Sequence, residues 1–140
     1  MKISILAVGK LRDRHMAALC DDYLTRARRQ VPVEVIEVDD DAALARRLPA
    51  RAEIIALEPG GDAWTTEQLA KHLESRMIHG AQGVAFLIGG ALGLPKAVVA
   101  KASRRLSLSN LTLPHRLARV VLCEQLYRAM SIIRGEPYHH

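Results

Sequence analysis

The chain has 140 residues, of which 49% are hydrophobic, and it carries a formal net charge of +5 with a pI near 9.6. This length is typical of one globular domain, residues 1–140, with a sizeable core. No apolar stretch reaches the roughly 20 residues that cross a bilayer, and the start MKISILAVGK turns polar too early for a signal peptide. We therefore expect a cytoplasmic protein with no membrane association. The basic charge indicates either attraction to RNA, DNA or nucleotides, or simply a solvated surface rich in arginine.

Five short runs of strand-forming residues alternate with helical segments along the chain. This alternation predicts an α/β fold with a parallel sheet and helices on its faces. The run VAFLI has no polar alternation, as expected for a central strand covered on both sides, whereas VEVIEV alternates and should meet water on one face. The predicted strands are Lys2–Val8, Pro32–Val38, Glu53–Leu57, Val84–Ile88 and a weaker Arg105–Leu108.

Two amphipathic helices are predicted between the strands. In the first, helical spacing predicts one apolar face made of Met16, Leu19, Tyr23 and Ala27. The second runs from Thr66 to about His79 after a capping box of Thr65 and Gln68, with Trp64 placed to pack on Leu69.

A last helix is predicted from about His115 to Arg134, with Pro114 before its first turn and Gly135 after its end. Its apolar surface is wider than one stripe, which favours a second partner and hence a homodimer. Cys20 and Cys123 lie too far apart for a redox motif or a zinc knuckle, so we expect packing thiols and no metal site.

Three predicted loops follow strands and carry the candidate chemistry. The turn Gly89–Gly93 lets backbone approach a ligand closely, and a tight turn without a ligand is the alternative. It does not match the dinucleotide fingerprint, and the early Val8-Gly9-Lys10 lacks the preceding glycine and the Ser or Thr of a phosphate-binding P-loop. The stretch Leu108–Pro114 offers an apolar slot with backbone donors, which suits an adenine-like ring. With Leu57–Asp62, these loops should converge on one crevice at the end of the sheet.

These loops and the C-terminus resemble the RlmH family of SPOUT-class methyltransferases. The resemblance rests on FLIGGALGL, LSLSNLTLPHRLARVVLCEQLYRA and the terminal RGEPYHH, and it extends from ISILAVGK to the last residue. Family members methylate N3 of a pseudouridine in 23S ribosomal RNA of assembled ribosomes. The resemblance therefore implies a large-subunit rRNA methyltransferase that uses S-adenosyl-L-methionine and acts as a homodimer.

The resemblance also implies a SPOUT-type parallel sheet whose C-terminal part forms a trefoil knot, which sequence periodicity alone would never suggest because knots are nearly absent among folds. It further implies a set of cofactor-contacting positions: Leu57, Gly89, Gly90, Leu108, Ser109, Asn110, Leu111, Thr112 and Leu113.

Methyl transfer from an activated sulfonium needs alignment above all, but N3 must also lose its proton. His139, beside Tyr138, is the first candidate for the base, and His115 is the second. Tyr138 and His139 are thus the predicted catalytic residues, whereas Tyr127 fits the core as well as the site. The predicted RNA-binding residues are Arg116, Arg119, Arg128 and Arg134.

The chain departs from the family pattern at two places. It ends in His140 where relatives carry Arg or Lys, and it has Glu58-Pro59-Gly60-Gly61 where they usually have Asp, a variable residue, Gly and Lys. The missing lysine would weaken RNA contact unless Arg51 or Arg76 replaces it. Two alternatives stay open: a knotted methyltransferase with another RNA target, and a non-catalytic RNA-binding or ribosome-assembly factor. A nucleotide-binding module of the flavodoxin type is disfavoured, because the sequence has no acidic ribose contact and no phosphate loop.

Overall fold

A computed structural model describes residues 1–139, apart from the side chain of His139. Its strands form one five-stranded sheet in the order β2-β1-β4-β3-β5, and each neighbouring pair is parallel. The predicted parallel α/β fold is therefore confirmed. The strands are β1 (Lys2–Val8), β2 (Val33–Val38), β3 (Glu53–Asp62), β4 (Gly83–Ile88) and β5 (Arg104–Leu106).

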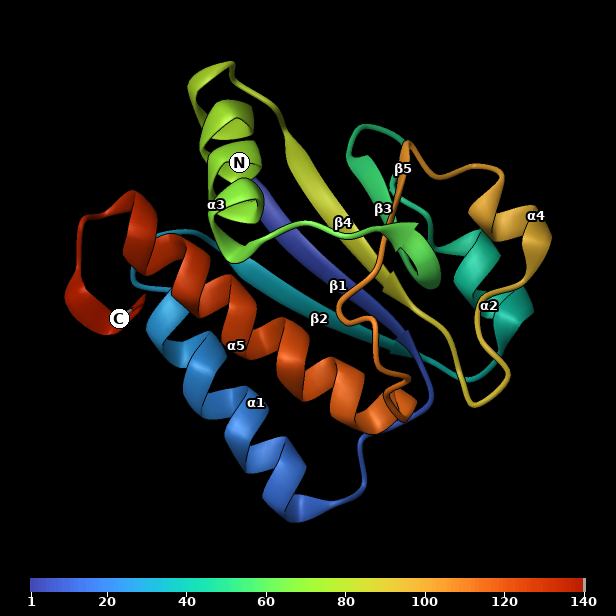
Figure 1. Cartoon of the computed structure of the whole chain (residues 1–140). Helices are drawn as coiled ribbons and strands as arrows, with labels where there is room; N and C mark the ends of the chain where they lie inside the picture. The colour runs from blue at the N-terminus through green and yellow to red at the C-terminus, as the bar shows by residue number, and fades with distance from the viewer. Residues whose placement is uncertain (140) are drawn as a thin grey trace.

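Helices cover both faces of the sheet, as predicted (Figure 1). On one face, α1, α3 and α5 pack on a core that includes Ile5 and Phe86. On the other face, α2 and α4 pack on a smaller core around Leu6 and Leu87. The helices are α1 (Arg14–Ala27), α2 (Asp41–Arg46), α3 (Thr66–Ile78), α4 (Lys96–Val99) and α5 (His115–Ile133), followed by the short 3-10 helix η1 (Pro137–His139).

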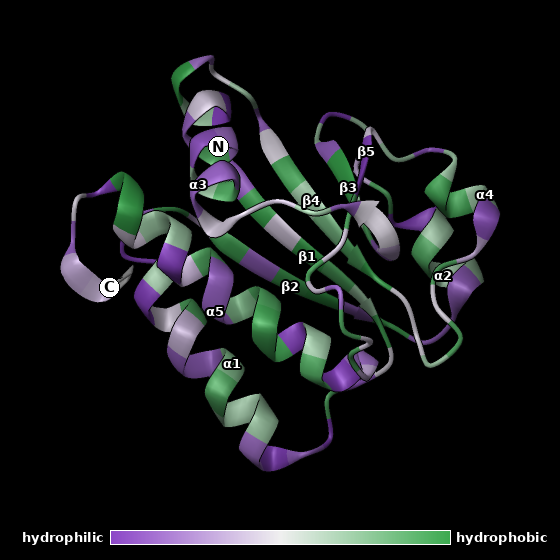
Figure 2. Cartoon of the chain, in the orientation of Figure 1, coloured by the Kyte–Doolittle hydropathy of each residue, from purple (hydrophilic) through white to green (hydrophobic). Residues whose placement is uncertain are grey.

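The two strand patterns read from the sequence behave as expected. Every residue of β4 is buried, and the central strands are mostly green in Figure 2, which marks hydrophobic residues. Strand β2 lies at an edge of the sheet, and its face with Val35 and Glu37 is exposed. At these positions the predicted contact with water is confirmed. An edge strand tolerates such contact, since only a central strand needs apolar residues on both sides.

The structure differs from the predictions in four places. Strand β3 continues to Asp62, β5 is the three-residue Arg104–Leu106, and the six-residue α2 was not predicted. Leu57 and Asp62 both pair with Leu106, so the residues between them bulge out of the sheet. On α1, Leu19 is 47% exposed and therefore was wrongly placed in the apolar face, where Cys20 and Leu24 are buried instead.

The helix ends match their sequence signals. The Thr65 side chain accepts from Gln68 N, and the Gln68 side chain accepts from Thr65 N, so the capping box is present. Helix α5 ends before Gly135, whose positive φ of 72° is costly for other residues. Among the described residues, no helix is long and apolar enough to cross a membrane. Cys20 and Cys123 are buried free thiols, in keeping with the packing role expected of them.

Candidate active site

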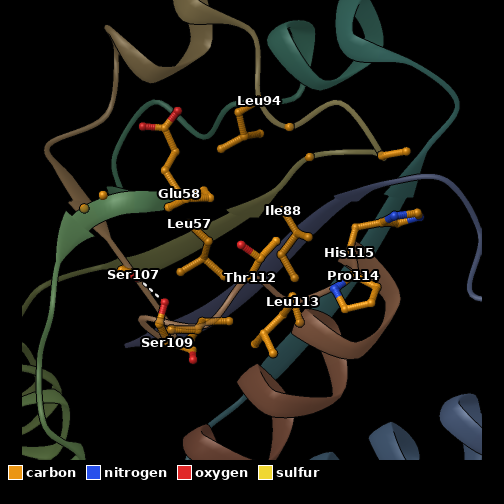
Figure 3. Close-up of a pocket in the computed structure, with 18 of the residues that line it drawn as sticks. Leu57, Glu58, Ile88, Leu94, Ser107, Ser109, Thr112, Leu113, Pro114 and His115 are labelled. Atoms are coloured by element: carbon orange, nitrogen blue, oxygen red, sulfur yellow. Dashed lines mark hydrogen bonds between the residues drawn. The ribbon is translucent and has the colours of Figure 1, made fainter.

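The main pocket lies at the carboxyl ends of β3, β4 and β5, where open α/β sheets bind ligands. Its volume is about 890 Å³, within the range usual for small-molecule sites. Its walls are the bulge after Leu57, the turn between β4 and α4, the connection from β5 to α5, and the first turn of α5. In Figure 3, Leu57, Ile88 and Leu113 surround the interior, and His115 lies at one end.

The glycine turn after β4 owes its shape to close backbone packing. Gly93 N donates to Gly90 O over 3.0 Å, and Gly93 has a φ of 83°. A Cβ on Gly89 would lie 2.4 Å from the carbonyl carbon of Gly93 and 2.6 Å from Leu94 N. A side chain at Gly89 would therefore force the turn open. A Cβ on Gly90, by contrast, would only touch a Val8 methyl at 3.6 Å.

The β5–α5 connection forms the opposite wall and orders itself through its own side chains. Ser107 Oγ donates to Ser109 O over 2.8 Å (Figure 3). Leu111 N donates to Ser109 Oγ over 2.9 Å. Such local bonds fix a loop that has no strand or helix partner. The side chain of Leu111 remains 77% exposed at the rim of the pocket, as does Leu92 at 102%.

The charges of the pocket restrict its ligand. No lysine or arginine is among the described residues that line it, and its carboxylate, Glu58, accepts from Arg105 Nε over 2.7 Å. A phosphate chain would find no lysine or arginine in the described lining, although the first turn of α5 offers the positive end of a helix. An apolar or positively charged ligand with an aromatic ring fits this lining better.

The structure brings together all nine predicted cofactor-contacting residues in this one pocket. His115, the second candidate base, lines it as well. The residues that meet there are Leu57, Gly89, Gly90, Leu108, Ser109, Asn110, Leu111, Thr112 and Leu113. This convergence joins segments that are up to 56 positions apart in sequence, from Leu57 to Leu113.

Tyr138 lies elsewhere, against the C-terminal half of α5. Its hydroxyl donates to Glu124 Oε2 over 2.8 Å, and its ring packs on Tyr127 with a centroid distance of 4.5 Å. Arg128 completes the cluster, because it donates to Glu124 over 2.6 Å and lies 4.8 Å above the Tyr138 ring. The side chain of His139 and the whole of His140 fall outside the described residues.

This terminal cluster controls two protonation states. Burial raises the pKa of Glu124, but the hydrogen bonds from Arg128 and Tyr138 outweigh burial and hold it below its ordinary value. Burial and the hydrogen bond to the Glu124 carboxylate both raise the pKa of Tyr138. Tyr138 is therefore held as a neutral phenol that donates its proton to Glu124. Glu124 was not singled out from the sequence, although its i,i+4 spacing from Arg128 was a usable signal.

The four predicted RNA-binding arginines occupy different environments. Arg116 and Arg134 are exposed, whereas Arg128 is held by Glu124. Arg119 is only 6% exposed, and it binds Glu37 and donates to Gly9 O over 2.9 Å. The Arg119 guanidinium thus joins α5 to the carboxyl ends of β1 and β2, beside the pocket. It therefore does not face solvent.

Comparison with known proteins identifies the family. Residues 1–139 match the family model described as "Predicted SPOUT methyltransferase". The chain is 49% identical to a protein of Sorangium cellulosum named "Ribosomal RNA large subunit methyltransferase H", over 100% of both chains. A Rubrobacter xylanophilus protein of the same name is 46% identical, over 99% of this chain and 98% of its own.

Solved structures agree on the fold. "Crystal structure of TrmJ from Z. mobilis ZM4" has a TM-score of 0.56 and 18% identity, over 98% of this chain and 71% of that one. "Structural insights into the 2-OH methylation of C/U34 on tRNA" has a TM-score of 0.55 and 17% identity, over 93% of this chain and 91% of that one. With the full-length match to the family model and the close relatives, this makes the chain a member of the SPOUT methyltransferase family.

Proposed function

We propose that the chain is an S-adenosyl-L-methionine-dependent methyltransferase that modifies N3 of a pseudouridine in large-subunit (23S) ribosomal RNA within assembled ribosomes. The observation that carries this proposal is that all nine expected cofactor positions line the main pocket. Relatives named as large-subunit rRNA methyltransferases match the full chain, which supports the choice of substrate.

The pocket fits the methyl donor in both shape and charge. S-adenosyl-L-methionine supplies an electrophilic methyl group on a sulfonium and carries no phosphate. The apolar slot of Leu57, Leu108 and Leu113 suits its adenine ring, and backbone groups of the β5–α5 connection can form hydrogen bonds with the edge of the ring. The absence of lysine and arginine from the described lining avoids repulsion of the sulfonium. Family membership adds the expected trefoil knot, in which α5 and its preceding connection would be threaded through the chain.

A homodimer is part of the proposal because one chain does not bring Tyr138 to its own pocket. Glu124, which anchors Tyr138, lies nine residues after His115, or roughly 13 Å along α5. The terminal cluster thus packs against the middle and C-terminal half of α5, whereas the pocket lies at the start of the helix (Figure 1). A second copy would bring its terminus to this pocket. Leu19 and Leu117, on helices that pack together, are 47% and 38% exposed and offer apolar surface for that copy.

The proton on N3 needs a base with an available lone pair, and Tyr138 is unsuited because its phenol is held neutral by Glu124. We infer that Tyr138 instead anchors the terminus, and that His139 takes the proton, with His115 as the alternative inside the pocket. Arg116 and Arg134 are exposed and are proposed to contact RNA phosphates. An enzyme that modifies assembled ribosomes would act in the cytoplasm.

The proposal is tested by methyl transfer. Purified protein is incubated with labelled S-adenosyl-L-methionine and either ribosomes lacking the modification or deproteinised large-subunit RNA, and the methyl group is mapped by mass spectrometry. We expect one methylated N3 of a pseudouridine in ribosomes, and much less transfer by His139→Ala with His79→Ala, an exposed surface histidine, as control. Cofactor binding without methyl transfer would refute the proposed substrate. Absence of cofactor binding would refute the proposal that the chain is a methyltransferase of this kind.

A further inference from the structure

A second hollow, the amino-edge groove, lies on the face of the sheet that carries α2 and α4. Its floor is formed by Ser4 of β1 and Ile36 of β2, with Leu6 beneath it, and its rim includes Arg47 and Arg51 of the connection after α2. Its volume is about 310 Å³. It opens near the amino ends of the strands, whereas the main pocket lies at their carboxyl ends, roughly 20 Å away by the length of β1.

The charge of the amino-edge groove is positive and unbalanced. Lys2 Nζ lies 2.6 Å from Glu34 Oε2, so the carboxylate of the groove is already paired. The exposed side chains of Arg47 and Arg51 form no hydrogen bond or ion pair with any described residue. Two unpaired guanidiniums beside a hollow attract an anion, and their planar forks match the oxygens of a phosphate.

The uncharged surface of the groove indicates more than a bare anion. Ile36 is half-buried and presents carbon to the ligand, whereas Leu6 is fully buried beneath the floor. The Ser4 hydroxyl and the Gln82 amide add polar groups beside it. An apolar floor with polar groups and two cations on the rim suits a flat ring attached to a phosphate. The volume is at the lower end for ligand sites, which limits the occupant to about one nucleotide.

We propose that the amino-edge groove binds one nucleotide unit of RNA, with its phosphate on Arg47 and Arg51 and its base over Ile36. The inference rests on the proposed function, since it places a second part of the same RNA substrate on this chain. Contact at both edges of the sheet fixes the orientation of the RNA, and the phosphate contact adds affinity that falls with salt.

The first test uses the ¹⁵N-labelled full chain, titrated with uridine 5′-monophosphate and separately with inorganic phosphate. We expect the nucleotide to shift the amide signals of Ser4, Arg51 and Gly83, and to bind more tightly than phosphate. The double variant Arg47→Gln/Arg51→Gln should bind it at least about tenfold more weakly, because two charge-assisted contacts are lost. Lys71→Gln, which removes one charge from the exposed side of α3 on the opposite face, should bind it as the wild type does.

The second test separates this inference from the proposed function. With ribosomes as substrate, the double variant should raise KM several-fold and keep kcat, since the groove is remote from the methyl-transfer pocket. Equal binding of phosphate and nucleotide, or equal loss in Lys71→Gln, overturns the inference. An unchanged KM in the double variant overturns it too, while methyl transfer by the wild type leaves the proposed function standing. If the nucleotide binds as expected but the wild type transfers no methyl group, the proposed function fails and the groove remains a nucleotide site.

Discussion

Replacing Gly89 by alanine should close the main pocket, because the added Cβ meets only backbone. Its nearest neighbours would be the Gly93 carbonyl carbon at 2.4 Å, the Gly93 oxygen at 2.6 Å and Leu94 N at 2.6 Å. No side chain can rotate away, so the turn itself must move by several tenths of an ångström or more. Overpacking of this kind costs about 1–3 kcal/mol. For a chain of this size that corresponds to a fall in Tm of roughly 3–10 °C.

Gly90→Ala is the matched control for this prediction. Its Cβ would lie 3.6 Å from a Val8 methyl, which is an ordinary contact, and Gly90 has no positive φ. We expect thermal unfolding of Gly90→Ala to stay within about 2 °C of the wild type, since such substitutions cost under about 0.5 kcal/mol. Calorimetry should also show weaker S-adenosyl-L-methionine binding by Gly89→Ala. Equal Tm values for the two variants would refute the argument that this turn is set by backbone contact at Gly89.

Three further substitutions test the contacts around α5 and α3. Glu124→Gln should lower the free energy of unfolding by about 1–2 kcal/mol at pH 7. The pKa of Glu124 is lower in the folded than in the unfolded protein. Urea unfolding should therefore show the full difference above about pH 5, and the difference should disappear as the pH falls through the folded pKa. Arg119→Met should lower the free energy of unfolding by about 2–3 kcal/mol in the same assay. This is less than for a fully buried ion pair, because the Glu37 side chain is one-third exposed. A variant that kept its stability but lost RNA affinity would instead make Arg119 an RNA ligand. Thr65→Ala should cost about 1 kcal/mol by removing the cap of α3, and faster amide exchange confined to its first turn would identify the cause.

The sheet and the pocket were predictable because both depend on local signals. Strand β4 is an unbroken apolar run, and a glycine turn follows it directly. In a parallel sheet, such turns meet at one edge, so the sequence alone predicts that the three loops form one crevice. The extension of β3 was not predictable, since Leu57 and Asp62 share Leu106 as partner only through a bulge.

Other features depend on contacts between residues far apart in sequence. Arg119 has the helical spacing of a solvated residue, but Glu37, 82 positions earlier, draws it inward. Leu19 follows the apolar pattern of α1 and yet is 47% exposed, because α5 packs over Cys20 and Leu24 instead. The position of Tyr138 depends on the reversal at Gly135, which turns the terminus back along α5. None of these contacts has a local sequence signature.

The most direct test of the central claim is a mixed dimer. One subunit carries Gly89→Ala, and the other carries Tyr138→Ala with His139→Ala; distinct tags allow the mixed species to be isolated. If each pocket works with the terminus of the other subunit, one of the two sites is intact, and methyl transfer to ribosomes should be about half that of the wild type. Each parent homodimer should be nearly inactive. A mixed dimer as inactive as both parents would show that pocket and terminus act within one chain, and would contradict the account.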